Sequence, residues 1–240
     1  MRFGVALLLL SIGLNLLAQS QQDKVFKLAH DIEWYGQSSV KIPFSKRLVY
    51  VDPYKIPQND TPNVVLITHA HSDHLNANEI AKLTSNQAVI VAPVDCENEL
   101  RENGFENLFL VKPDDLFELD GVQIAVVKAY NRVKTSFHPI EKGWVGYVIS
   151  CDGISVYHPG DTERIPEMKK VKCDIAFMPL GQTYTMNSVN EAAESVKDVS
   201  PLFVIPFHYG IYEGNKNDTL SFKEALAGKV KVVVKDLNDK

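Results

Sequence analysis

The sequence predicts an α/β (α+β) protein built as a four-layer αββα sandwich, in which two mixed β-sheets pack face to face beneath outer helices. Two observations support this prediction. Apolar runs joined by short turns fill the first two thirds of the chain, and Asp-Gly separates two pairs of them, which is a strong hairpin signal. Strand-like and helix-like segments then alternate in the last third, as in βα units. We therefore expect several strand ends to meet along one edge of the sheets.

The individual elements follow from local patterns. Gly104 is placed to stop one helix, and Ser188-x-x-Glu191 has the form of a capping box at the start of another. The expected helices are residues Asn78–Leu83, Asp95–Asn103, Ser188–Lys197 and Ser221–Leu226. The expected strands, in chain order, are residues Val25–Leu28, Ile32–Tyr35, Ser39–Ile42, Leu48–Val51, Val64–Ile67, Ala88–Ala92, Leu116–Leu119, Val122–Val127, Val145–Ser150, Ile154–His158, Ile175–Met178, Leu202–Pro206 and Val230–Val234.

The N-terminus has the pattern of a secretory signal peptide. Met1-Arg2 precedes an apolar stretch from Phe3 to Leu17, and Ala18-Gln19-Ser20 follows it. The stretch is shorter than the ~20 apolar residues of a membrane span. We expect a signal peptide over residues 1–20, cleaved after Ala18 or Ser20, and a single domain over residues 21–240. The mature protein would be periplasmic or secreted and would keep no stable membrane span; an uncleaved anchor is the alternative.

Composition excludes some functions. The formal net charge is −5 and no basic stripe occurs, so nucleic-acid binding lacks its electrostatic footprint. The three cysteines, Cys96, Cys151 and Cys173, are not spaced as a metal motif, and buried unreactive thiols explain them best. A small-molecule substrate is the expected partner, and no pattern indicates an oligomeric state.

The densest chemical signal is Thr68-His69-Ala70-His71-Ser72-Asp73-His74-Leu75. It holds three of the seven histidines of the chain and directly follows an apolar strand, Val64–Ile67. Imidazole nitrogen and carboxylate oxygen are ligands that zinc and similar divalent ions favour. The octapeptide therefore predicts a metal site at a strand end.

Other strands also end in candidate ligands. Asp161 follows the strand that ends at His158, and His208 follows Val204–Pro206. Asn131 ends a third strand, with His138 in the loop beyond it. Alone, Asp161 reads as a helix cap or turn residue and His208 as an ordinary hydrogen-bonded histidine. Their shared position at strand ends favours one common site.

These motifs resemble the metallo-β-lactamase-fold hydrolase superfamily. The resemblance rests on His69-x-His71-x-Asp73-His74, on Gly160-Asp161-Thr162 and on His208 in Phe-His-Tyr-Gly, and it spans nearly all of the chain after the leader. Segments 143–147 and 179–186 are similar to a branch of uncharacterised hydrolases related to the bacterial ascorbate-phosphate lactonase. The resemblance implies the metallo-β-lactamase fold.

The resemblance also implies a site for two divalent metal ions. His69 and His71 would bind the first ion, Asp73, His74 and His208 the second, and Asp161 both. The third ligand of the first ion departs from the usual pattern: either Asn131 or His138 supplies it, or the first ion is under-coordinated. The histidine majority favours Zn²⁺, with Mn²⁺ or iron as alternatives.

The function expected from these motifs is hydrolysis of a lactone, amide or phosphoester bond. Asp73 would orient the attacking water and shuttle a proton. A metal-dependent oxidoreductase of the same fold and a non-catalytic metal-binding module are the alternatives. Tyr184 is a candidate hydrogen-bond donor to substrate or a packed tyrosine. The loop from Asn131 to Lys142, with Arg132 and Lys134, is either a positively charged lid for an anionic substrate or a solvated loop.

Overall fold

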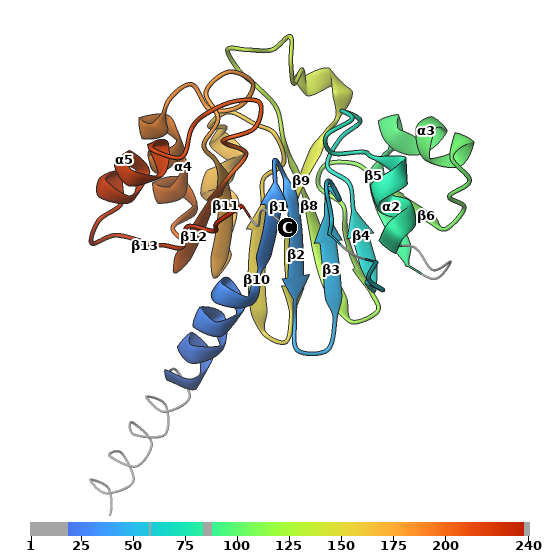
Figure 1. Cartoon of the computed structure of the whole chain (residues 1–240), viewed down its shortest axis with the longest axis horizontal. Coiled ribbons are helices and arrows are strands. Elements are labelled where there is room, and N and C mark those ends of the chain that lie inside the picture. Colours follow the sequence, from blue (N-terminus) through green and yellow to red (C-terminus); the bar gives the residue numbers. More distant parts are fainter. Residues whose placement is uncertain (1–18, 58, 84–87, 238–240) are drawn as a thin grey trace, which may run out of the picture.

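The computed structural model describes residues 19–57, 59–83 and 88–237. Two mixed β-sheets face each other at its centre, which confirms the predicted sandwich (Figure 1). Strands β1 to β6 form the first sheet in sequence order, antiparallel from β1 to β3 and parallel from β3 to β6. They are β1 (Glu33–Gly36), β2 (Ser39–Pro43), β3 (Leu48–Val51), β4 (Val64–Leu66), β5 (Val89–Pro93) and β6 (Leu108–Val111).

The second sheet has the order β13-β12-β11-β10-β9-β8-β7. Strands β7 to β10 form an antiparallel meander, and β10 to β13 pair in parallel, as the change along the chain from hairpins to βα units predicts. The strands are β7 (Leu116–Leu119), β8 (Val122–Lys128), β9 (Val145–Cys151), β10 (Ile154–His158), β11 (Ile175–Pro179), β12 (Phe203–Phe207) and β13 (Lys231–Val232).

Helices cover both outer faces. In Figure 1, α2 and α3 lie beyond the first sheet, and α4 and α5 lie beyond the second. The N-cap half of the predicted capping box is present, since Ser188 Oγ accepts from Glu191 N at 3.0 Å at the start of α4, while the Glu191 carboxylate accepts from Asn187 N, one residue before the position of a full capping box. The helical elements are α2 (Ala77–Leu83), α3 (Glu97–Glu102), α4 (Val189–Val199), α5 (Asp218–Ala225) and the short 3-10 turns η1 (Val94–Cys96), η2 (Ile140–Lys142) and η3 (Pro166–Lys170).

The main hydrophobic core lies between the two sheets. Leu66 of the first sheet and Tyr147 and Phe177 of the second are fully buried in it. A second cluster fills the space between the first sheet and its helices, with Ile67 and Ile80 among its members. Both faces of the first sheet are therefore covered, which fixes its strand ends rigidly.

Two expectations about elements were wrong. Residues 19–31 form a helix, not a strand, because Val25, Leu28 and Ala29 share the i, i+3, i+4 spacing that buries one helical face in the main core. Strand β6 was not expected. Its neighbour β5 supplies the parallel pairing that makes Leu108–Val111 a strand. Within the described residues, no helix combines the length and the apolar character that crossing a bilayer requires.

Candidate metal centre

The carboxyl ends of β4, β8, β10 and β12 meet at one edge of the sandwich, as the sequence predicts. Three groups of side chains there have ligand atoms that all lie within 4.8 Å of one another. The groups are His69, His71 and His138; His69, His74 and Asp161; and Asp73, His74 and His208.

The turn after β4 is held by its own backbone and by a buried carboxylate. His74 N and Leu75 N both donate to His71 O, at 2.9 and 2.8 Å, and these bonds close the turn. Asp52 at the end of β3 accepts from Thr68 N at 2.7 Å, and its other oxygen lies 2.8 Å from His74 Nδ1. His74 therefore presents Nε2 to the cluster, with its ring orientation fixed by a carboxylate.

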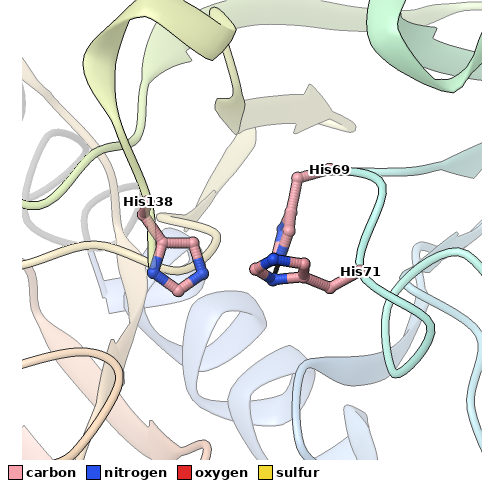
Figure 2. A group of neighbouring side chains, drawn as sticks. All are labelled: His69, His71 and His138. Atoms are coloured by element: carbon pink, nitrogen blue, oxygen red, sulfur yellow. Dashed lines mark hydrogen bonds between the residues drawn. The ribbon is translucent and has the colours of Figure 1, made fainter. Parts of the chain in front are cut away.

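His69, His71 and His138 form the first group. Figure 2 shows the ring of His138 facing those of His69 and His71 from the opposite loop. His69 Nε2 and His71 Nδ1 are 3.0 Å apart, and the Trp144 ring packs against both rings with centroids 4.8 Å away. The structure thus places the imidazole of His138 beside His69 and His71, the pair whose third ligand the sequence left undetermined.

Asp161 lies at the centre of the cluster. Its Oδ2 atom is 3.0 Å from His208 Nε2, 3.3 Å from His138 Nε2 and 3.4 Å from His74 Nε2. One carboxylate therefore contacts imidazoles of both outer groups. Gly160 makes this placement feasible for two reasons. Its φ of +64° is one that side chains disfavour, and a Cβ at this position would lie only 2.6 Å from Val145 O.

Asp73, His74 and His208 form the third group. His208 Nδ1 lies 2.6 Å from the buried carboxylate of Glu213, so its Nε2 faces inward. Gln37 reaches the group from the β1–β2 turn: its Nε2 donates to Asp73 Oδ2 at 2.9 Å and lies 3.4 Å from His208 Nε2. Each member of the group thus has a fixed neighbour outside it.

Backbone strain gathers at this site. Gln37, Asp52 and His208 have φ values of +45°, +46° and +58°, in the left-handed region that side chains disfavour. Such conformations cost about 1–3 kcal/mol each and persist where surrounding contacts impose them. The side chains of all three residues contact the cluster, so the strained backbone conformations occur where they direct these side chains toward it.

Burial and neighbouring charges shift the pKa values of the histidines in opposite directions. Burial lowers the pKa of His69, and the neighbouring His74 adds to that effect. Burial also opposes charge on His74 and His208, but the Asp161 carboxylate outweighs it and raises both pKa values, that of His208 to about 10. Burial would raise the pKa of Asp161, yet His208 and His74 hold it well below its usual value. In the metal-free cluster, His74 and His208 are therefore the basic members paired with the Asp161 carboxylate, and His69 is the neutral one.

The donor set passes a test of fit to metal ions. Among the described residues, four buried side-chain nitrogen or oxygen atoms have no hydrogen-bond partner. They are Gln37 Oε1, Asn131 Oδ1, His74 Nε2 and His138 Nε2, of which the last two lie 3.4 and 3.3 Å from Asp161 Oδ2 without hydrogen-bond geometry. All four belong to residues of the cluster or in contact with it, and buried polar atoms without partners are expected where an ion completes the site.

Asn131 holds a loop and contacts the first group only through the outer side of His138, where its Nδ2 lies 3.3 Å from His138 Nδ1. Its Nδ2 donates to Tyr184 O at 2.7 Å and to Lys134 O at 3.2 Å. Glu163 accepts from the backbone amides of Arg132, Val133 and Lys134 at 2.7 to 2.9 Å, which fixes the same loop. Lys134 Nζ donates to Met186 O at 3.0 Å, so its charge is held by backbone and does not face the pocket.

Three further kinds of residue have defined positions in the structure. His158 has a structural role, because its Nε2 donates to Ser38 O at 3.0 Å and Phe177 and Phe207 pack against its ring. Burial lowers the pKa of His158 to about 4. Tyr184 lines the pocket at the cluster. The three cysteines are unpaired, and burial raises the pKa of each thiol.

The sequence reading missed Asp52, Gln37, Glu163 and Glu213. Asp52 carried a usable signal, because it is the residue directly after the buried strand β3, and Asp161 likewise comes soon after β10, three residues beyond its end. Gln37 and the two glutamates carried none, since they lie in loops whose paths only the assembled fold defines.

An αββα sandwich with histidines and aspartates gathered at its strand ends defines the class of metallo-β-lactamase-fold proteins. The family model described as Beta-lactamase superfamily domain matches residues 31–208. A metal-dependent hydrolase of Thermococcus onnurineus is 33% identical over 217 residues, covering 85% of this chain and 95% of that protein. One of Methanopyrus kandleri is 32% identical over 226 residues, with the same two coverages.

A solved structure agrees. A candidate metal-dependent hydrolase from Parabacteroides distasonis superposes with a TM-score of 0.73 at 31% identity, covering 86% of this chain and 93% of that one. The chain therefore belongs to the metallo-β-lactamase superfamily, among its metal-dependent hydrolases.

The relatives overturn the predicted location. The first four are archaeal proteins, mostly of organisms that lack a periplasm, so the expectation of a periplasmic or secreted protein was wrong. That expectation rested on the apolar stretch within residues 1–18, which lies outside the described residues. An apolar stretch at a chain start resembles a leader whatever its role, which is why the pattern misled.

Proposed function

We propose that residues 21–240 form a single hydrolase domain that uses two divalent ions, both zinc, to activate water against a lactone, amide or phosphoester bond. His69, His71 and His138 would hold one ion, and Asp73, His74 and His208 the other. The observation that carries the proposal is the position of Asp161 Oδ2, 3.0 to 3.4 Å from imidazole nitrogens of both groups. Such an atom is suited to bridge two cations.

The remaining chemistry falls to side chains that border the pocket. When bound, the ions supply a water of lowered pKa and stabilise the negative charge that develops on the attacked group. Asp73 borders both the pocket and the third group, so its carboxylate can orient that water and carry a proton to the leaving atom. Tyr184 can donate from its hydroxyl to the substrate.

The metal assignment follows from donor type. Five of the seven proposed ligands are imidazoles, which suit zinc better than the oxygen-rich sites that manganese prefers. Bound iron with redox chemistry in place of hydrolysis would instead indicate the oxidoreductase alternative.

The test compares ligand variants on a panel of bonds. Zinc-loaded and manganese-loaded protein is assayed on lactone, phosphodiester, N-acyl and β-lactam substrates, together with Asp161→Asn, His71→Ala and the control His30→Ala, whose side chain is exposed. Turnover should vanish in the two ligand variants, with folding and the control unaffected. Full activity in both ligand variants would contradict the proposal, and metal content measured alongside shows whether ions were lost.

A further inference from the structure

The pocket at the metal centre has aromatic walls. It is a cavity of about 320 Å³, at the small end of the range for small-molecule sites. Five of its nine lining residues are proposed metal ligands. The other four, which are left to face a substrate, are Ser72, Phe137, Tyr184 and Tyr212. Three of these four are aromatic, so the substrate side of the pocket is largely a set of rings.

Three aromatic rings border the pocket, and two of them are in contact. Phe137 and Tyr184 meet edge to face, with centroids 4.9 Å apart at an interplanar angle of 87°. Tyr212 also lines the pocket, and its hydroxyl lies 2.8 Å from that of Tyr54. Phe137 is 38% exposed and Tyr212 is 55% exposed, although burial would stabilise both. Large rings left partly open around a polar centre are typical of a binding site.

Positive charge is missing from these walls. None of the residues that line the pocket is lysine or arginine. Of the nearby lysines, Lys134 is engaged with backbone carbonyls and Lys142 with Asp95, while Lys55 lies over the ring of Tyr54, next to Tyr212 but outside the lining. Phosphate groups are usually bound by arginine or lysine side chains. Outside the ligand cluster the walls therefore offer no cationic side chain to an anionic group, which favours an uncharged substrate over a phosphoester at the wall contacts.

From these walls we infer that the site takes an uncharged aromatic carboxylic ester or lactone, an inference that rests on the proposed hydrolase function. In the reaction, water oxygen forms a bond to the acyl carbon and the bond from that carbon to the leaving oxygen breaks. One proton of the water passes to the leaving oxygen, which gives an acid and a phenol or alcohol. Phe137, Tyr184 and Tyr212 hold the aromatic ring while the carbonyl faces Asp73 and the ligand cluster.

The test uses a matched pair of lactones. Dihydrocoumarin and δ-valerolactone share a six-membered lactone ring, and only the first carries a fused benzene ring. For zinc-loaded protein, we expect kcat/KM for dihydrocoumarin to exceed that for δ-valerolactone by about tenfold beyond their ratio of spontaneous hydrolysis rates, since a ring contact contributes about 1.4 kcal/mol. Phenyl phosphate, which keeps the ring but adds charge, should be a poor substrate.

Variants assign the preference to the walls. Phe137→Leu and Tyr212→Leu should reduce the preference for dihydrocoumarin several-fold, mainly through KM. Phe109→Leu is the matched control, because Phe109 is 37% exposed but lies on β6, outside the pocket. Saturation-transfer NMR of dihydrocoumarin with Asp161→Asn measures ring binding without turnover.

The outcomes separate the two proposals. Equal efficiency on both lactones, or a preference for phenyl phosphate, would overturn the aromatic inference and leave the hydrolase proposal standing. Ring binding that Phe137→Leu weakens, with no turnover of any substrate class, would support the inference about the walls and count against hydrolysis. Ring binding unchanged in both wall variants would overturn the inference directly.

Discussion

The carboxamide of Gln37, in the turn between β1 and β2, donates from Nε2 to Oδ2 of Asp73, in the turn after β4, at 2.9 Å. The contact restrains a carboxylate whose orientation the proposed chemistry requires. Gln37→Leu keeps comparable bulk but removes the donor. We expect zinc affinity to fall about tenfold or more, the size of effect seen for hydrogen-bonded neighbours of metal ligands.

Competition with a chromogenic chelator measures this effect. Gln123→Leu, on an exposed position of β8, makes the same replacement away from the site and should bind zinc as the unaltered protein does. Equal affinity in Gln37→Leu would show that Asp73 is oriented without help.

Glu213 anchors both His208 and the loop that carries Tyr184. Its carboxylate lies 2.6 Å from His208 Nδ1 and accepts from the backbone amides of Thr183 and Tyr184 at 2.7 and 2.6 Å. Glu213→Ala leaves these buried donors unpaired, so the free energy of unfolding should fall by about 3–5 kcal/mol. Urea denaturation of the metal-free protein checks this, with the exposed Glu118→Ala as control. A loss as small as that of the control would refute the anchoring role.

Gly146 on β9 has no space for a side chain. A Cβ there would lie 2.6 Å from the carbonyl oxygens of His158 and Pro159, backbone atoms that cannot swing away. Gly146→Ala should therefore destabilise the fold by about 1–3 kcal/mol, the usual cost of overpacking. Because Pro159 leads into Gly160 and Asp161, zinc affinity should fall as well. An unfolding midpoint and an affinity equal to those of the parent would contradict the geometry.

Metal binding should release protons. In the metal-free protein His208, with its pKa raised to about 10, is protonated at neutral pH, and so is His74, whereas the lowered pKa of His69 leaves it neutral. Metal ions bind neutral imidazole, so affinity should increase with pH up to about 10. Calorimetric titration with zinc at pH 7, in two buffers of different ionisation enthalpy, measures the protons released. Identical heats in both buffers would contradict the prediction.

The same shift acts on stability with a definite sign. A raised folded-state pKa stabilises the fold fully below the unfolded value of 6.5. The contribution from His208 is then lost as the pH rises through about 10. Metal-free protein should therefore unfold more easily in urea as the pH is raised across this window.

The strands and the gathering of the candidate ligands were largely predictable from the sequence, because both depend on local patterns. Leu48–Val51 and Leu116–Leu119 were predicted with their exact bounds, since hydrophobic alternation and turn residues define them. His69, His71, Asp73 and His74 lie on one turn and needed no tertiary information.

The remaining features required the assembled fold. The choice between Asn131 and His138 depended on which way a long loop folds, and Glu163 decides that through amides far from it in sequence. The strand assignment of Val25–Leu28 failed because four residues cannot reveal a helical period that extends to Ile32. Gln37 reaches the cluster through a positive φ, which sequence patterns indicate reliably only for glycine.

The turn at residues 161–163 connects the proposed metal ligands with a loop whose exposed positions are free to change. Asp161 belongs to the ligand cluster, while Glu163, two residues on, holds the loop that presents Phe137 and His138. Within that loop, the side chains of Val133, Thr135 and Ser136 are exposed. Substitutions at those positions could remodel the approach to the pocket without moving the metal ligands, which gives the scaffold a route to new substrates under selection.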